Sequence, residues 1–279
     1  MQTNSGIYKL LWIIVPFRGG NLSSLFGFLS RHIWFIQNGG RILLKSDSRL
    51  NSDVRHSLRH GCLTLLEAPD SNIYEAWNQA IEHLGRQEIS DKSYIIWLGL
   101  DDSLQQDFLS RAVQEIPENS YPDFIFGDVY GVFAKRYRLL KAPNSPELFG
   151  AGPFSFDVFH PGLLNLWGSL KNRRFDTRYK LAADLDFYIG INHDKSVTYR
   201  KIDCIQAMVG SDGISQEARG KLIYSHEWLQ IEKNRGVSLR VDRKRIFIFE
   251  MIARFPAIYR VLRIVYWRIV GLEVRGLGS

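Results

Sequence analysis

Cysteine is scarce in this sequence, which holds only Cys62 and Cys204, far apart and outside any C-x-x-C spacing. A disulfide framework requires several paired cysteines, and a thiolate metal centre requires them in close clusters. Both kinds of site are therefore excluded. With no disulfides to form, the chain fits the reduced environment of the cytoplasm.

Long apolar runs are missing as well. The first such run, Leu10–Val15, is too short for the core of a signal peptide or for a membrane-spanning helix. Hydrophobic residues make up 45% of the 279 residues and charged residues 23%, a balance typical of a globular protein with one large or two small domains. The composition therefore excludes a disordered chain and a polytopic membrane protein.

Excess charge of one sign is confined to the end of the chain. The 36 basic and 29 acidic residues give a net charge of +7, and residues 235–279 contain ten basic and three acidic residues, which is also +7. Residues 1–234 are thus neutral. A nucleic-acid groove needs a basic face on the body of the protein, so we expect no nucleic-acid partner. We divide the chain into a main domain, residues 1–234, and a basic tail, residues 235–279.

Strands and helices are predicted to alternate through the first half of the chain. Continuous apolar runs favour buried strands, and apolar residues at helical spacing favour helices between them. This order predicts a parallel sheet covered by helices on both faces, with the site at the carboxyl ends of the strands. The predicted strands are Leu10–Pro16, Arg41–Lys45, Cys62–Glu67, Tyr94–Leu100 and Asp123–Phe126, then a hairpin-like Val129–Ala142 and strands within Ser196–Val209. The predicted helices are Leu22–Leu29, Ile73–Leu84, Gln106–Ile116, Asp184–Ile191 and Ser225–Arg235, and Pro143–Pro153 is predicted to be a loop.

Several common site signatures do not occur. The sequence has no G-x-x-x-x-G-K-[ST], no G-x-G-x-x-G after the first strand, no G-x-S-x-G and no H-E-x-x-H. P-loop nucleotide hydrolysis, a Rossmann dehydrogenase, an α/β-hydrolase and a zincin are therefore disfavoured. What remains is a set of carboxylates at the ends of strands.

Two adjacent carboxylates, Asp101 and Asp102, follow the apolar run that begins at Tyr94. Mg²⁺ and Mn²⁺ bind through one or two protein carboxylates together with substrate phosphates, so the pair suits such an ion. The alternative is that Asp102 or Ser103 caps the next helix, because Asp and Ser are preferred there.

A second motif spans Asp70–Ala80, where a helix is predicted to begin beside the strand ends. The amino end of a helix offers free N–H groups to a diphosphate, and Asn78, one turn in, is placed to donate to the same ligand. An ordinary amphipathic helix with an Asp or Ser cap would have the same pattern.

A third motif holds Asp184 and Asp186 on a short helix. Residues two apart cannot share a helix face, so at most one of them points into a site. A capped helix with one solvated acid is the alternative.

Taken together, these motifs resemble those of the family 2 glycosyltransferases of GT-A fold, especially the bacterial enzymes of surface-polysaccharide and lipopolysaccharide assembly. The segments that carry the resemblance follow the family's order between Leu10 and about Arg235: Asp70–Ala80, Trp97–Asp102, Gly127–Val129, Phe159–Gly162, Phe175–Asp186 and Asp212–Ser215. The resemblance implies a mostly parallel, Rossmann-like sheet flanked by helices, with residues 1–234 as the catalytic domain. It implies an inverting transfer of a sugar from a nucleotide-diphosphate sugar to a hydroxyl of a glycan or lipid-linked acceptor.

The resemblance also implies residue roles. Asp47 would hold the base or ribose of the donor nucleotide with help from Asp70, and Asp184 would be the catalytic base. Asp101 and Asp102 would hold Mg²⁺ or Mn²⁺, with Asp102 as the principal ligand.

Two further residues receive weaker roles. His160 would lie in the acceptor site or near the metal, with a structural role as the alternative. Asp186 would support the loop or contact the acceptor.

The sequence departs from the family pattern at several points: Ser46–Ser48, Asn72, Trp77, Gln79 and Leu100. Gln79 replaces a lysine, which removes a cation from the phosphate region. Two alternatives therefore stay open: a non-catalytic homologue that binds sugar nucleotide or a partner protein, and a sugar nucleotidyltransferase.

The basic tail combines apolar residues with single arginines from Ile246 to Val270 and has a break at Pro256. The arginines and the proline argue against a spanning helix and favour an interfacial helix on anionic lipid, at the inner face of the plasma membrane. A helix packed on the sheet with snorkelling arginines is the alternative. The aromatic residues expected at the lipid headgroups are Phe247, Phe249, Phe255, Tyr259, Tyr266 and Trp267.

Overall fold

The structure is a computed structural model that describes residues 5–116, 120–133, 136–142, 160–192, 197–210, 217–237, 246–247, 249–250 and 253–270. Its elements in chain order are α1 (Ser5–Tyr8), β1 (Leu11–Phe17), α2 (Leu22–Arg31), α3 (Ile33–Gln37), β2 (Arg41–Ser46), α4 (Ser52–Ser57), β3 (Leu63–Glu67), α5 (Ile73–Arg86), β4 (Tyr94–Trp97), β5 (Ser103–Leu104), α6 (Gln106–Glu115), β6 (Phe124–Phe133), β7 (Arg136–Leu140), β8 (Leu164–Leu166), α7 (Trp167–Leu170), α8 (Ala183–Asn192), β9 (Tyr199–Gly210), α9 (Ala218–Arg235) and α11 (Pro256–Val270). The predicted loop Pro143–Pro153 and the motif Asp212–Ser215 lie outside the described residues.

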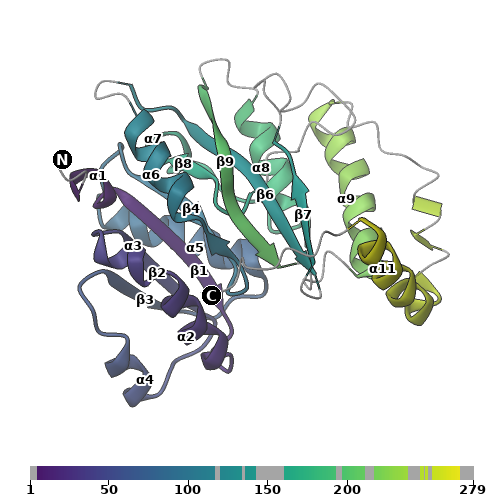
Figure 1. The fold of residues 1–279 in the computed structure, drawn as a ribbon, viewed down its shortest axis with the longest axis horizontal. Coiled ribbons are helices and arrows are strands. Elements are labelled where there is room, and N and C mark those ends of the chain that lie inside the picture. Colours follow the sequence, from purple (N-terminus) through teal and green to yellow (C-terminus); the bar gives the residue numbers. More distant parts are fainter. Residues whose placement is uncertain are drawn as a thin grey trace.

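The described strands form one twisted sheet (Figure 1) in the order β3-β2-β1-β4-β8-β6-β9-β5, with β7 beside the second half of β6. β3, β2, β1 and β4 are parallel to one another, as the alternation of strands and helices predicts. β8 runs antiparallel between β4 and β6, whereas β6 and β9 are parallel. The sheet therefore places the carboxyl ends of its first four strands along one edge.

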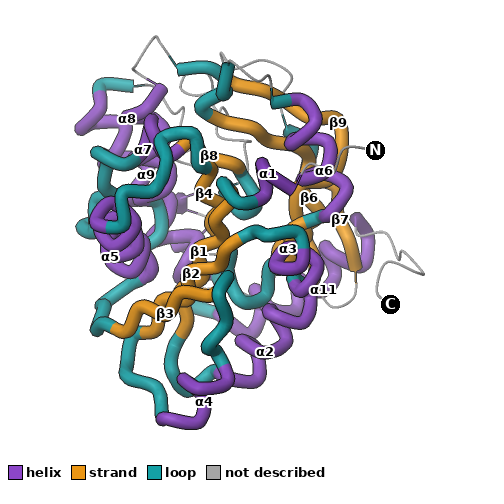
Figure 2. The backbone as a smooth tube through the Cα atoms, turned by 90° about the vertical axis from the view of Figure 1, so that its left-hand side faces the viewer, coloured by secondary structure: helices purple, strands orange, loops and turns teal. Residues whose placement is uncertain are grey.

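Helices cover both faces of this sheet. Figure 2 shows α5, α7, α8 and α9 on one side of the strands and α1, α2, α3 and α6 on the other. Along β1, Trp12 and Ile14 enter the core on the α5 side, and Leu11, Ile13 and Val15 enter the core on the α6 side. This alternation, with both sides buried, explains why the strand is a continuous apolar run.

Some boundaries and short elements differ from prediction. The strand predicted over Tyr94–Leu100 ends at Trp97, and the helix predicted from Ser225 begins at Ala218. The strand predicted to end at Phe126 continues to Phe133 past a bulge at Gly127. Glycine is needed there, because a Cβ atom would lie 2.5 Å from a carbonyl oxygen of β9. Unpredicted elements are short: α1, α3, α4, β5, α7 and β8.

Two contacts hold the start of α8 against α9. The carboxylate of Glu227 accepts hydrogen bonds from the backbone N–H groups of Lys180, Leu181 and Ala182, at 2.6–2.9 Å. Arg235 donates two hydrogen bonds of 2.7 Å to Asp186. Both carboxylates are buried, so α9 determines where α8 begins and which way its first turn faces.

We predict that Glu227→Gln lowers the free energy of unfolding by about 1.5–3 kcal/mol, because three backbone donors lose a charged acceptor. Urea denaturation of the full chain measures this loss. The matched control is Gln230→Ala on an exposed position of the same helix, which is expected to change stability by less than about 0.5 kcal/mol. Equal midpoints for both variants would contradict the assigned role of Glu227.

Candidate active site at the carboxyl edge of the sheet

The loops that follow β1, β2, β3 and β4 meet at one edge because these strands are parallel. Arg18 follows β1, Asp47 follows β2, Asp70 follows β3 and Asp101 follows β4. Between their end residues these strands are apolar except for Lys45 and Thr64, so polar side chains gather where the strands end.

Asp47 and Asp70, predicted to bind the donor nucleotide, lie together through a shared arginine. Arg18 donates to Asp47 Oδ2 at 3.0 Å and to Asp70 Oδ1 at 3.4 Å. The N–H of Gly19 donates to Asp47 Oδ1 at 2.9 Å. The Gly19 N–H and the Arg18 guanidinium hold the pKa of Asp47 below its usual value. Asp47 is therefore an anion at neutral pH.

Lys45 completes this cluster from inside the sheet and was not predicted as a site residue. Its Nζ is fully buried and donates to Asp70 Oδ2 at 2.7 Å and to the carbonyl oxygens of Ala68 and Ser46 at 2.6 and 2.9 Å. A lysine at the end of an otherwise apolar run was the signal in the sequence, because a buried ammonium needs a carboxylate partner.

Asp101 and Asp102 differ in exposure. Asp102 is buried, and its Oδ2 accepts the N–H of Gly99 at 2.7 Å. Burial, with the charge of Asp101, raises the pKa of Asp102 to about 7. Asp101 is exposed, and a Cβ atom on Gly99 would approach its Oδ1 to 2.9 Å. A Cβ atom on Gly210, at the end of β9, would overlap the same carboxylate.

The capping alternatives for the first two motifs are wrong. The N-cap of α6 is Gln105, so neither Asp102 nor Ser103 caps that helix. The N-cap of α5 is Asn72, whose side chain accepts from two backbone N–H groups. The paired carboxylates and Asp70 thus have no capping role.

Asn78 contacts the backbone of Phe175 in both directions. Its Nδ2 donates to the carbonyl of Phe175 at 2.9 Å, and its Oδ1 accepts the N–H of Phe175 at 2.8 Å. The residue therefore ties α5 to the loop before α8, which is a positioning role.

Asp184, the predicted base, is half-buried at the start of α8. Its Oδ1 accepts from the hydroxyl of Tyr74 at 3.3 Å and from the N–H of Leu185 at 2.9 Å. Burial raises the pKa of Asp184 to about 6, although these hydrogen bonds oppose the shift. Asp186 turns away to Arg235, so the two acids face differently, as their spacing requires.

His160 is buried in an aromatic cluster with Trp77, Trp97 and Tyr188. The hydroxyl of Tyr188 donates to Asn165 Oδ1 at 2.9 Å and contacts His160 Nδ1 at 3.1 Å. The hydroxyl proton is used on Asn165, so Nδ1 must be the donor to Tyr188 and Nε2 carries a lone pair. Among the described residues Nε2 has no hydrogen-bond partner. Burial lowers the pKa of His160 to about 3, so the ring is neutral.

The Asp101–Asp102 pair fits a divalent cation whose coordination shell is completed by the phosphates of a bound substrate. No group of three or more His, Cys, Asp or Glu side chains able to hold a metal occurs within the described residues. Mg²⁺ takes one or two protein carboxylates and completes its shell with water and substrate phosphates. An exposed carboxylate seated between two glycines, beside a buried one of raised pKa, meets that requirement.

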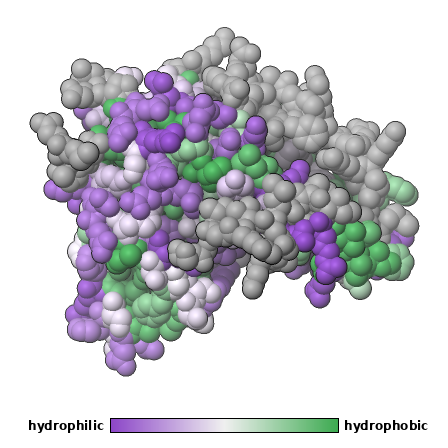
Figure 3. Space-filling model, in the orientation of Figure 1, coloured by the Kyte–Doolittle hydropathy of each residue, from purple (hydrophilic) through white to green (hydrophobic). Residues whose placement is uncertain are grey.

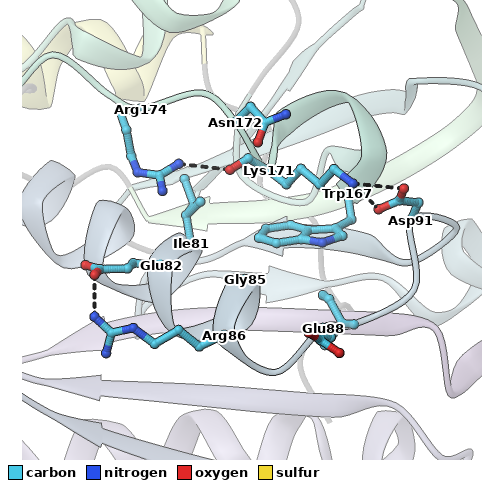
Figure 4. A pocket seen from close by; sticks show the side chains of 11 residues that line it. Ile81, Glu82, Gly85, Arg86, Glu88, Asp91, Trp167, Lys171, Asn172 and Arg174 are labelled. Atoms are coloured by element: carbon cyan, nitrogen blue, oxygen red, sulfur yellow. Dashed lines mark hydrogen bonds and ion pairs between the residues drawn. The ribbon is translucent and has the colours of Figure 1, made fainter.

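A separate cavity of about 660 Å³ lies between α5 and α7 (Figure 4), and no predicted site residue lines it. Two pairs of its charged groups contact one another: Lys171 contacts Asp91 at 2.7 Å, and Arg86 contacts Glu82. Asp91 precedes β4, so this cavity lies at the amino end of that strand, away from the carboxyl edge.

Structural comparison identifies the architecture. The structure of S. aureus TarS 1–349, a family 2 glycosyltransferase of GT-A fold, matches with a TM-score of 0.51 and 14% identity, over 78% of this chain and 65% of that one. The fold is the GT-A fold. The fold prediction is thereby confirmed, and the similarity supports the resemblance noted in the motifs. At this identity the match shows the fold alone, and the chain spans about 65% of the length of TarS 1–349.

Two other similar structures were found. A longer S. aureus TarS structure matches with a TM-score of 0.49 and 15% identity, over 78% of this chain and 39% of that one. A 2-C-methyl-D-erythritol 4-phosphate cytidylyltransferase from Francisella tularensis matches with a TM-score of 0.40 and 10% identity, over 70% and 90%. No protein-family model matches the sequence, and no curated protein matches it either.

We predict that the two cations of the Asp70 cluster contribute very differently to stability. Lys45→Met is expected to cost about 3–5 kcal/mol, because it leaves a buried carboxylate without its buried partner. Arg18→Met is the matched control, because it removes an exposed partner of the same carboxylate and should cost less than about 1 kcal/mol. Chemical denaturation measures both values, and equal losses would contradict the distinction.

Proposed function

We propose that this protein is an inverting glycosyltransferase that moves a sugar from a nucleotide-diphosphate sugar to a hydroxyl group of an acceptor. The observation that carries the proposal is Asp184, a carboxylate with a pKa near 6 that contacts Tyr74 at the start of α5. That helix start follows directly on Asp70 of the carboxyl edge. Asp184 therefore contacts the helix that begins three residues after Asp70, and its raised pKa suits a general base.

Donor binding falls to the cluster around Asp47 and Asp70. These carboxylates would accept hydrogen bonds from the base and ribose. The buried ammonium group of Lys45 would hold the Asp70 carboxylate in place through its hydrogen bond. Arg18 is 59% exposed and spans both acids. Its guanidinium places a positive charge at the carboxyl edge. This charge would take the place of the lysine that the family has at the position of Gln79.

Asp101 and Asp102 would hold Mg²⁺ or Mn²⁺, which neutralises charge on a leaving diphosphate when bound. Asp101 is the ligand that solvent reaches, and Asp102 supports it from the interior. Because Asp101 is exposed and Asp102 is buried, we assign the role of principal metal ligand to Asp101, although the sequence favours Asp102.

Asp184 would accept the proton of the acceptor hydroxyl as its oxygen bonds to the anomeric carbon. The bond between that carbon and the diphosphate oxygen breaks, and the nucleoside diphosphate leaves with the electron pair. Attack from the opposite face inverts the configuration. Asp186 supports α8 through Arg235.

The acceptor we propose is a glycan or lipid-linked molecule of cell-surface polysaccharide or lipopolysaccharide assembly, used at the inner face of the plasma membrane. This part of the proposal rests on the motif resemblance and on the basic, apolar tail. No helix among the described residues has the length and apolar character that crossing a bilayer requires.

We predict that Asp184→Asn lowers kcat by about 10²–10⁴ while donor binding is retained, because it removes a positioned general base. Steady-state release of nucleoside diphosphate, with a panel of UDP-, GDP- and dTDP-sugars, measures the rate, and calorimetry measures donor affinity. Asp186→Asn is the control, expected to reduce stability more than kcat. An active Asp184→Asn with a folded but inactive Asp186→Asn would reverse the assignment.

The pH dependence of the rate is a second test of Asp184 as the general base. The base works only when deprotonated, so kcat/KM should fall about tenfold per pH unit below pH 6 and level off above it.

Release of pyrophosphate in place of nucleoside diphosphate would favour a nucleotidyltransferase. Donor binding without any turnover would favour a non-catalytic homologue.

We predict that Asp101→Asn removes the metal-dependent part of donor affinity. Gly210→Ala should have a similar effect, since its added methyl group displaces the Asp101 carboxylate while leaving its charge. Calorimetric donor titration with Mn²⁺ and with EDTA measures both, and a melting curve checks the fold. Donor affinity that is indifferent to EDTA and to Asp101→Asn would contradict the metal assignment.

A further inference from the structure

α11 exposes a continuous apolar stripe on one side. Ile258, Val261, Leu262 and Val265 follow the spacing i, i+3, i+4, i+7, which places them on one helix face, and each is 45–59% exposed. Phe255, just before the helix, is 56% exposed. In Figure 3 this region forms a green patch at the right-hand end of the molecule, where Figure 1 shows α11.

α11 also contacts the sheet. Arg136 of β7 donates to the carbonyl oxygen of Arg268 at 2.7 Å, and α11 lies against β7. Tyr259, on a different face from the stripe, is half-buried. The alternative of a packed helix is thus correct for part of α11 only, and the aliphatic side chains of the stripe are exposed.

The charge on this part of the molecule has one sign. α11 contains three arginines and no acidic residue, and β7 beside it contains Arg136 and Arg138 and no acidic residue. Leu139 of β7 is also exposed. An apolar face on a helix whose only charged residues are arginines is the pattern of a helix that lies in the headgroup region of anionic lipid.

We propose that α11 and β7 together form a docking surface for an anionic lipid bilayer. The 15 residues of α11 span only about 22 Å, shorter than the hydrocarbon core, so the helix lies along the surface. Its aliphatic stripe enters the acyl boundary, and the arginines reach the lipid phosphates. A second copy of this chain is a poorer occupant, because pairing two such faces would bring like charges together.

The residues that meet lipid differ from those the sequence favours. Phe255 and Phe247 are exposed as predicted, but the central contacts are aliphatic residues of α11, and β7 contributes as well. The side chains of Tyr266 and Trp267 lie outside the described residues. The proposal does not depend on the glycosyltransferase assignment, although it would bring a lipid-linked acceptor to the enzyme.

The test is co-sedimentation of the full chain with vesicles of phosphatidylglycerol and phosphatidylcholine, and with phosphatidylcholine alone. We expect binding to the anionic vesicles that weakens with salt. The double variant Val261→Ser/Leu262→Ser should lose at least about tenfold in vesicle affinity, because two half-exposed side chains no longer enter the acyl region. Arg260→Gln/Arg268→Gln should lose affinity for the anionic vesicles, by about fivefold for each charge removed.

The matched control is Phe26→Ser/Ile33→Ser, which removes two equally exposed apolar side chains from α2 and α3 and should leave vesicle binding unchanged. Donor titration of every variant separates this surface from the proposed active site, since none of these residues is assigned to donor or metal binding. Equal sedimentation of wild type and Val261→Ser/Leu262→Ser would overturn the proposal. So would a dimer, seen by ultracentrifugation, that the same double variant dissociates while vesicles bind neither protein.

Discussion

Burial of β1, β2 and β4 between two layers of helices is the constraint from which the rest of the site follows. A strand with apolar neighbours on both faces cannot carry polar groups in its interior without a large desolvation cost. Polar chemistry is therefore restricted to the first residues beyond each strand, and the parallel arrangement brings those residues to one edge. Lys45 tests this rule, since it lies inside β2, and it is accommodated only because Asp70 and two carbonyl oxygens surround its ammonium group.

The acids of the candidate site differ in protonation behaviour. Asp47 has a lowered pKa because a backbone N–H and Arg18 stabilise its charge. Asp102 and Asp184 have raised pKa values, near 7 and near 6, because burial disfavours their charged forms. A carboxylate with a lowered pKa stays ionised and suits a hydrogen-bond acceptor. A carboxylate with a raised pKa suits a proton acceptor, or a group whose charge a nearby cation stabilises. The residue types alone could not separate these roles.

Long, regular patterns in the sequence predicted most of the fold. The continuous apolar runs gave the four parallel strands, and the helical spacing gave α2, α5 and α6. What escaped prediction depends on tertiary contacts. β8 has only three residues and forms because it pairs with both β4 and β6. β6 continues past Phe126 only because residue 127 is a glycine, since a side chain at that position would collide with β9.

The candidate site was predictable to a similar degree. The motif order singled out Asp47, Asp70, Asp101 and Asp184. Arg18 was missed because a cation at a strand end has no pattern of its own until its carboxylate partner is known. Lys45 was missed although a lysine at the end of an apolar run signals a buried partner. The positioning role of Asn78 depends on Phe175, a residue 97 positions away, which no local pattern reveals.

α9 connects the two functional regions. Its Glu227 and Arg235 fix the start of α8 and hence the direction of Asp184, although Arg235 was counted with the tail by charge. The same helix faces the tail at its other side, where His226 lies 3.8 Å from Glu250. One helix therefore holds the proposed base in place while it also contacts the segment that leads to the exposed stripe of α11. A bilayer bound to that stripe would meet the protein in a fixed orientation, because α11 contacts β7 and β7 belongs to the sheet whose far edge carries the proposed donor site.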